Sequence, residues 1–398
     1  MFKKSFFTFL LFSLLYGCIQ PLELESIEYK DLLVVEALLT NENKHHTVKL
    51  SRTFKLDANG PEFETGALVM IKDNSQNTYL FTENANGEYI SNQKFNAELD
   101  KSYTLEITTK DGTVYSSTPE KMAGISPVGN IEVIKEKNNL NKDGVAFYVN
   151  NNQASYKGYY YRYEYQEDYK IIAPYWDERI INILSNIAPW EVEVIVDRNN
   201  LRKKTCYKSQ NSTSILQTET VSLNNNNYEF KIHFIEEKSH LIAHRYSIKV
   251  KQYIQSVNAY NYFKTLKKLS TSESLFTQSQ PGQIASNITS KNSNVLGIFE
   301  VSSVSEKRIF INREDFFPST EADYQIKCNF TADALVDRSG TYSPLIQTLE
   351  ANLRVYYKHN SNPYANPDEL YRPYILVSTA CGDCSVLGDN NKPSFWID

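Results

Sequence analysis

The chain has 398 residues, of which 41% are hydrophobic, and it carries a formal net charge of −5 at pH 7. This length suggests two domains, and the apolar content is sufficient for a substantial core. The mildly acidic balance argues against nucleic acid as a partner, because binding to nucleic acid needs a concentrated basic surface. Only 14 glycines and 13 prolines occur beside 28 tyrosines, which excludes a low-complexity chain.

The first residues have the pattern of an export signal. Lys3 and Lys4 form a short basic segment, and residues 5–16 are an almost wholly apolar run. A run of this length is too short for a permanent membrane span, which needs about 20 apolar residues. It is typical of the apolar part of a signal peptide, which we therefore predict over residues 1–17.

A small residue and a cysteine, Gly17 and Cys18, follow this run in the order at which bacterial lipoproteins are cleaved and acylated. We expect Cys18 to be acylated and residues 18–30 to form a lipidated tether, since several acyl chains hold a protein at a membrane without spanning it. The alternative is an ordinary signal peptide followed by a chance cysteine. Loss of residues 1–17 would remove two lysines and no acid, so the net charge would change from −5 to −7.

Seven short segments between residues 32 and 118 alternate apolar and polar residues or are rich in β-forming residues. Turn dipeptides such as Asn86-Gly87 and Asp111-Gly112 separate several of them. This spacing predicts an N-terminal immunoglobulin-like or transthyretin-like β-sandwich over residues 31–122. The expected strands are 32–40, 46–53, 67–74, 77–83, 87–91, 102–109 and 113–118.

Two prolines and two glycines interrupt the pattern around residues 119–130 and indicate a domain boundary. We predict a larger β-rich domain over residues 123–398. Its clearest expected strands are 131–137, 145–151, 159–172, 192–198, 228–237, 244–255 and 295–311.

One segment changes to helical periodicity. Val257, Tyr260 and Leu266 recur at helical spacing, and Ser256 is a suitable N-cap. The larger domain is therefore expected to contain one main helix, over residues 256–269.

The expected strand over residues 159–172 is rich in tyrosine. Tyr159, Tyr161, Tyr163 and Tyr165 fall on one face, because side chains alternate along a strand. Such a face could be an aromatic platform for a sugar or a peptide. We favour the alternative that these tyrosines pack a half-buried surface.

Tyr175, Trp176 and Trp190 form the candidate ligand surface. Two of the three tryptophans in the chain lie in this region, which contains Pro174 and Pro189. Large aromatic side chains in loops are frequent recognition residues, because they offer much contact area at a small entropic cost. The alternative is a buried satellite core or a helix over residues 177–187.

Four cysteines remain once Cys18 carries lipid, namely Cys206, Cys328, Cys381 and Cys384. An exported chain folds in an oxidising compartment, where disulfides persist. A redox site would need a helix after the first cysteine of the CxxC motif, whereas the Gly-Asp pair inside this motif indicates a turn. A four-cysteine zinc site is chemically allowed, but its ligands would be far apart in the sequence. We favour structural disulfides over both alternatives.

The favoured interpretation makes the C-terminal segment a clasp. At least one of the last two cysteines is expected to bond to Cys206 or Cys328. Such a bond would tie the tail to the second domain, so that the aromatic pair Phe395 and Trp396 docks instead of fraying.

Motifs for nucleotide binding, serine hydrolysis, zinc proteolysis and calcium binding are missing from the sequence. His45 and His46 are adjacent, and we expect a solvated pair rather than metal ligands. No catalytic residue, metal or cofactor is therefore predicted, and we expect that the protein is not an enzyme.

Several stretches together resemble the family of domain of unknown function 4249, which comprises lipoproteins of Bacteroidota. The most specific are VLGIFEVSSVSEKRIFI at 295–311 and CGDCSVLGDNNKPSFW at 381–396; KKTCYKS at 203–209 and the helix region at 245–269 add to them. Where family members show phenylalanine, an acid and proline after the helix, this chain has Phe276-Thr277-Gln278.

The resemblance covers nearly the whole mature chain and implies a lipid-anchored protein of the outer membrane, expected at the cell surface. It further implies a TonB-dependent outer-membrane transporter as the partner, with an unknown ligand. Our first hypothesis is a non-catalytic binding or accessory subunit of a nutrient uptake system. The alternatives are a structural or adhesion envelope lipoprotein and a lipid-anchored hydrolase.

Overall fold

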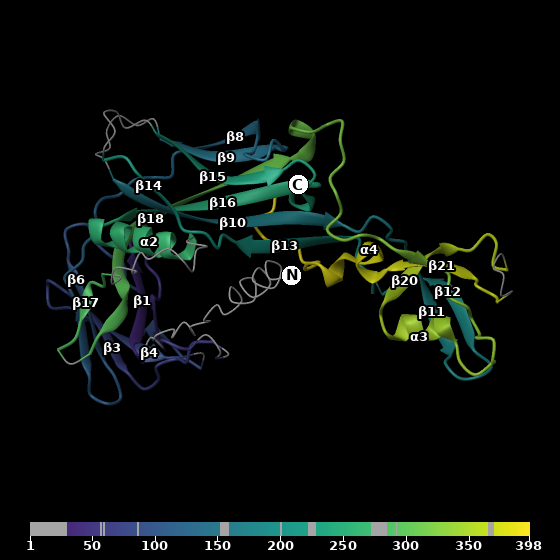
Figure 1. The fold of residues 1–398 in the computed structure, drawn as a ribbon, viewed down its shortest axis with the longest axis horizontal. Helices are drawn as coiled ribbons and strands as arrows, with labels where there is room; N and C mark the ends of the chain where they lie inside the picture. The colour runs from purple at the N-terminus through teal and green to yellow at the C-terminus, as the bar shows by residue number, and fades with distance from the viewer. Residues whose placement is uncertain are drawn as a thin grey trace, which may run out of the picture.

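The computed structural model describes residues 30–398 apart from 56–57, 59, 86, 152–158, 200, 222–227, 272–284, 292 and 365–369. The predicted signal peptide, Cys18 and the stretch Phe276-Thr277-Gln278 lie outside the described residues. The protein is mainly β, with 46% strand and 10% helix. Figure 1 shows a first lobe with β1, a second with β10 and a small third lobe with β20 and β21. Within the described part of the chain, no helix is long and apolar enough to cross a membrane.

The first lobe is a sandwich built from the seven strands expected in the N-terminal region. Their order, β1-β2-β5-β4 and then β3-β6-β7, is that of the two sheets of a constant-type immunoglobulin domain. Here β4 also pairs with β3, so the two sheets are continuous. The strands are β1 (Leu33–Thr40), β2 (Thr47–Arg52), β3 (Leu68–Asp73), β4 (Thr78–Glu83), β5 (Glu88–Ser91), β6 (Tyr103–Thr108) and β7 (Val114–Ser117).

Alternation along these strands places one face in the core of the first sandwich. On β1, Leu33, Val35 and Leu39 are buried, whereas Glu36 is exposed. Burial of such apolar side chains stabilises the fold by roughly 25 cal/mol for each Å² removed from water. The alternation of apolar and polar residues in the sequence thus determines which side chains of each strand face the core.

The longest strand, β18 (Val295–Asn312), joins the first sandwich to the second. Its first half pairs in parallel with β1. Its second half pairs antiparallel with β16 (Arg245–Gln255). The sandwich expected over residues 31–122 therefore also contains half of β18, together with β17 (Ile288–Thr289), which pairs with β7.

The side chain of Asn287 connects the edge strand β17 back to β18. Its Nδ2 donates to the carbonyl oxygen of Phe299 at 2.8 Å, and its Oδ1 accepts from the N–H of the same residue at 2.9 Å. Asn287 therefore satisfies the N–H and the carbonyl group of Phe299 on the side of β18 where no strand of the described residues pairs.

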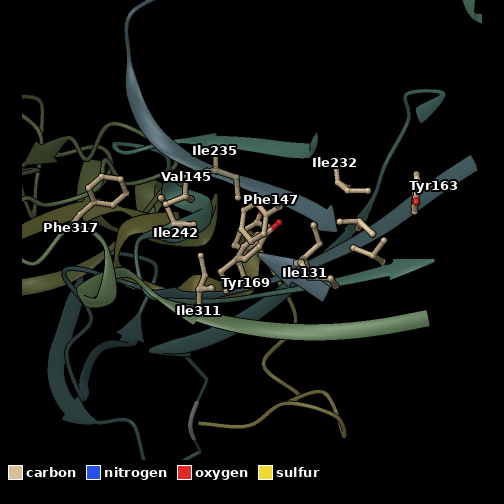
Figure 2. Packing of buried hydrophobic residues seen from close by; sticks show 14 of the residues in the cluster. Ile131, Val145, Phe147, Tyr163, Tyr169, Ile232, Ile235, Ile242, Ile311 and Phe317 are labelled. Carbon is tan, nitrogen blue, oxygen red and sulfur yellow. The ribbon is translucent and has the colours of Figure 1, made fainter. Parts of the chain in front are cut away.

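The second sandwich packs the sheet β15-β9-β8 against the half-sheet β13-β10-β16-β18. Figure 2 shows side chains of both layers meeting between them, among them Phe147 of β9, Tyr169 of β10 and Ile311 of β18. Its further strands are β8 (Asn130–Lys137), β9 (Asp143–Asn151), β10 (Tyr160–Ile172), β13 (Thr205–Asn211), β14 (Leu216–Glu219), which pairs with β10, and β15 (Tyr228–Glu236).

The tyrosines of β10 belong to this core. Tyr161 and Tyr163 are buried, and the Tyr163 hydroxyl is 2.5 Å from that of Tyr228 and 3.0 Å from Oε1 of Gln252. Burial raises the pKa of Tyr163 well above its ordinary value, so the hydroxyl stays neutral. The packing interpretation of this strand is confirmed, and the exposed aromatic platform is wrong.

The main helix, α2 (Val257–Thr271), matches the helix expected over residues 256–269. Ser256 caps it, because its Oγ accepts a hydrogen bond from the N–H of Ala259 at 3.2 Å. The helix lies across the outer face of the half-sheet, on the side opposite the core of the second sandwich (Figure 1).

A buried cation lies beneath α2. The guanidinium of Arg162 is 4.2 Å from the ring centroid of Tyr253 and 4.8 Å from that of Phe263, a residue of the helix. Arg162 pairs with Glu300 at 3.2 Å and also with Glu164. Burial alone would lower the pKa of Arg162, but the two carboxylates outweigh it and raise this pKa. The charge is thus paired and stacked, as a buried charge requires.

The third lobe packs the hairpin β11-β12 and the helix α3 against the sheet β19-β21-β20. Leu345, Tyr356 and Leu376 form its buried centre, and Ile181 packs against them. The elements are β11 (Arg179–Ser185), β12 (Glu191–Val196), β19 (Phe330–Thr331), α3 (Pro344–Glu350), β20 (Arg354–His359) and β21 (Tyr374–Ser378).

The helix considered over residues 177–187 does not form, because this segment contains β11. β11 pairs antiparallel with β12. Its isoleucines are β-branched and favour a strand, and Val192 and Val194 of β12 pack against the same small core. The sequence of this segment was compatible with a helix or a strand, and pairing with β12 makes it a strand.

Replacement of Gly297 by alanine is expected to destabilise the protein strongly. Gly297 has a φ of +105°, and an added Cβ would lie 1.9 Å from the carbonyl oxygen of Val35 on β1. Gly112→Ala is the matched control, because Gly112 has a φ of +85° but a Cβ there would meet nothing within 4 Å. We expect the control to lose about 1 kcal/mol and Gly297→Ala several times more, measured by urea unfolding. Equal losses would contradict the close approach of β18 to β1.

Candidate functional site

The C-terminal segment is held by two disulfides. Cys206 of β13 bonds to Cys384, 178 residues later, and Cys328 bonds to Cys381, 53 residues later. Cys381 lies in the short helix α4 (Thr379–Gly382) that follows β21. Both of the last two cysteines therefore bond to a distant cysteine, where the sequence analysis expected this of at least one of them. With all four sulfurs paired, no thiolate remains for a zinc site or for redox exchange.

The tail beyond the disulfides docks on the outer face of the second sandwich. Trp396 is 4% exposed, and its ring centroid lies 5.0 Å from Tyr207 and 5.7 Å from Phe310. The guanidinium of Arg308 lies 3.7 Å from the ring centroid of Phe395 and pairs with the buried carboxylate of Asp168. The tail therefore covers an ion pair that would otherwise face solvent.

Three aromatic side chains gather at the surface beside the Cys328–Cys381 bond, and we call them the aromatic cluster: Tyr175, Phe330 and Tyr357. The ring centroid of Tyr175 is 4.9 Å from that of Phe330 and 5.3 Å from that of Tyr357, and the other two are 5.5 Å apart. Phe330 is 43% exposed, and the two tyrosines are half-buried. The Nζ of Lys358 lies 5.3 Å from the Tyr357 ring.

The backbone around the aromatic cluster is fixed from several directions. The N–H of Tyr175 donates to the carbonyl oxygen of Cys381 at 2.9 Å, and Phe330 follows Cys328 by two residues. A Cβ on Gly382 would lie 2.4 Å from Val355, so the chain is closely packed there. The three rings thus stand on a frame that the disulfide and these contacts hold in place.

Arg202 fixes the junction between the second sandwich and the third lobe. It is 6% exposed, and its guanidinium donates to the carbonyl oxygens of Tyr356 at 2.8 Å and Asp177 at 2.9 Å. Burial lowers the pKa of Arg202 even though carboxylates lie nearby. One buried cation therefore bonds the backbone of β20 to the segment that leads into β11.

The structure does not unite the three predicted ligand residues in one surface. Tyr175 belongs to the aromatic cluster, but Trp176 packs against the core of the second sandwich and donates its Nε1–H to the Arg202 carbonyl oxygen at 3.3 Å. Trp190 is half-buried just before β12, at the far end of the hairpin. A strand as long as β11 separates the two ends by roughly 20 Å. Closeness in sequence was misleading here, because the intervening segment is extended.

Phe330 and Tyr357 were missed by the sequence analysis. They lie on β19 and β20, more than 150 residues after Tyr175. One signal existed: in RVYYKH, adjacent tyrosines must point to opposite faces of a strand, so one of Tyr356 and Tyr357 had to leave the core. No pattern in the neighbouring sequence indicates that Tyr175 would contact Tyr357.

Of the histidine pair in the first sandwich, His45 is exposed, as expected for a solvated pair, whereas His46 is buried, which corrects the expectation for that residue. His46 is 2% exposed, and its Nε2 is 2.9 Å from the carbonyl oxygen of Phe95, while Nδ1 of His45 is 2.7 Å from that of Ser91. Burial lowers the pKa of His46. In the described part of the chain, no group of three or more His, Cys, Asp or Glu side chains is arranged to hold a metal ion.

The fold and the site define a mainly β protein in which two disulfides secure the C-terminal segment. The model of the family described as "Domain of unknown function (DUF4249)" matches residues 19–308, and the chain belongs to this family. A search of curated proteins found no match. Tyr175 and Cys206 lie within the matched residues, whereas Phe330, Tyr357 and the other three disulfide cysteines follow them.

Removal of either disulfide should destabilise the protein, more so for the one that closes the longer loop. From loop lengths of 178 and 53 residues, we expect losses of up to about 5 kcal/mol for Cys206→Ala/Cys384→Ala and about 4 kcal/mol for Cys328→Ala/Cys381→Ala. Urea unfolding of the two double variants measures this. Only the first pair should also expose the last residues to carboxypeptidase, because only that bond ties the tail to β13. A tail that stays protected in both variants would contradict this.

Proposed function

We propose that this chain is a non-catalytic lipoprotein of the outer membrane, anchored through Cys18, that serves as a binding or accessory subunit of a TonB-dependent nutrient uptake system. The observation that best supports a binding role is the aromatic cluster, a surface set of three rings in contact, one exposed and two half-buried, on a disulfide-fixed frame. The family membership is compatible with this proposal and assigns no activity.

The physical argument for binding rests on exposure and rigidity. Large rings left at a surface offer apolar faces that stack on the flat faces of sugars or on peptide side chains. Their frame is already ordered, so a ligand would not need to order it, which reduces the cost of binding. Lys358 beside Tyr357 adds a cation at the rim of the cluster.

The arrangement of the lobes supports the same proposal. The described chain begins just before β1, in the first sandwich, whereas the aromatic cluster lies at the junction of the second sandwich with the third lobe, the lobe farthest from β1 along the long axis (Figure 1). A protein anchored near its first sandwich would thus present the cluster far from its attachment point.

Loss of the aromatic cluster should remove partner binding without unfolding the third lobe. We expect Phe330→Ala/Tyr357→Ala to reduce recovery of a TonB-dependent transporter, in pull-downs from gently solubilised outer membranes, by at least about 30-fold, as for hot-spot residues. Tyr364→Ala is the control, because Tyr364 is 61% exposed on the same lobe but lies outside the cluster. Failure of the unaltered protein to recover a transporter would favour a structural or adhesion role.

Replacement of Cys18 by serine should release the protein from the membrane fraction, because serine cannot carry the thioether-linked lipid. The neighbouring substitution Ile19→Ser, which leaves the cysteine intact, should not. Flotation of membranes with immunoblotting compares the two. Stable retention of Cys18→Ser would disprove the anchor.

A further inference from the structure

The end of the first sandwich where the tether begins is built around Thr53. Its Oγ1 accepts from the N–H of Leu32 at 3.0 Å and donates to the carbonyl oxygen of Lys30 at 2.6 Å, and its N–H donates to the carbonyl oxygen of Leu32 at 3.0 Å. The first described residues are therefore fixed to the segment that follows β2. We call this end of the first sandwich, which contains Lys30, Leu32 and Thr53, the tether end.

Large apolar side chains are exposed at the tether end. Phe54, next to Thr53, is 47% exposed, and Phe63, which bridges to Ser51 at the end of β2, is 53% exposed. Leu68 and Val114 are also exposed, and both lie opposite Thr108 in the sheet, at the same end.

The opposite end of this sandwich is different. Among the described residues of its loops (41–46, 74–77, 92–102 and 118–122), only Leu99 is an exposed large apolar side chain. The asymmetry is informative, because scattered single apolar residues are normal on a surface whereas a concentration at one end marks an interaction site.

The charges at the tether end are mixed. Exposed lysines there are Lys30, Lys55, Lys110 and Lys291, and exposed acids are Asp31, Glu62 and Asp111. Arg52 and Glu64 pair with one another. A partner is therefore recognised mainly through the apolar side chains, and lysines near the rim would reach outward past them.

We infer that the tether end rests on the surface of a lipid bilayer, with Phe54 and Phe63 inserted at its interface. The inference deepens the proposed function, because it rests on the same lipid anchor. The choice of a bilayer follows from the tether: Lys30 lies twelve positions after Cys18, so the two residues are at most about 40 Å apart when the chain between them is fully extended. An anchor this short keeps the apolar side chains at a high effective concentration near lipid, so that a weak contact is well populated.

Quenching of tryptophan fluorescence by brominated lipid tests the contact directly. The mature chain with Cys18→Ser and an N-terminal histidine tag is held on phosphatidylcholine vesicles through a chelating lipid, so that natural acylation is not needed. Phe54→Trp and Phe63→Trp place the reporter at the tether end. Leu140→Trp is the control, because Leu140 is 76% exposed between β8 and β9 of the second sandwich. The chain without an added tryptophan gives the emission of the three native tryptophans, which is subtracted from that of each variant.

We expect brominated phosphatidylcholine to quench the added emission of Phe54→Trp and Phe63→Trp and to leave that of Leu140→Trp unchanged. Quenching should persist in high salt, since the contact is apolar. Absence of quenching at both phenylalanine positions, equal quenching of the control, or loss of quenching in salt would overturn the inference.

The two proposals fail in different ways. If Cys18→Ser stays in the membrane fraction but the held protein is quenched at Phe63→Trp, the anchor is wrong and the lipid contact stands. If the native protein is anchored but no quenching occurs, the lipid contact is wrong and the anchor stands. If, in addition, Phe54→Ser/Phe63→Ser reduces recovery of the transporter, the tether end binds a protein instead.

Discussion

The parallel pairing of β18 with β1 is the constraint on which the rest of the structure depends. It joins segments about 260 residues apart, so the entropy of closing this loop must be offset by burial in two places. Phe299 and Val301 supply that burial in the first sandwich, and Ile311 supplies it in the second. Because one strand serves both sheets, neither sandwich has its complete sheet without the other. The backbones can approach only because Gly297 carries no Cβ.

The shared half-sheet carries charge on its outer face, and two segments cover it. At one end α2 lies over Arg162, whose charge Glu300 balances. At the other end the C-terminal tail lies over the pair of Arg308 and Asp168. A buried ion pair adds little stability by itself, but loss of one partner is costly. These pairs therefore specify where the helix and the tail dock.

The two disulfides have separate consequences. The bond between Cys206 and Cys384 secures the tail to β13, where Tyr207 and Asp389 also form a β-bridge. The bond between Cys328 and Cys381 closes the third lobe at its junction with the second sandwich, beside Arg202. The aromatic cluster lies at this junction, so the disulfide and the hydrogen bond from Tyr175 to Cys381 fix the backbone that carries its rings. The surface proposed for binding is therefore held in place by a covalent bond and by backbone hydrogen bonds.

The sequence by itself determined the local structure. Alternating apolar residues predicted the seven strands of the first sandwich, and helical spacing after Ser256 predicted α2, because each periodicity is written in consecutive residues. Only the tertiary structure decided which distant segments meet: that β17 and β18 return to the first sandwich, how the cysteines pair, and that Phe330 and Tyr357 join Tyr175. It also made β11 a strand and buried His46. Such outcomes depend on partners far along the chain, which no local pattern specifies.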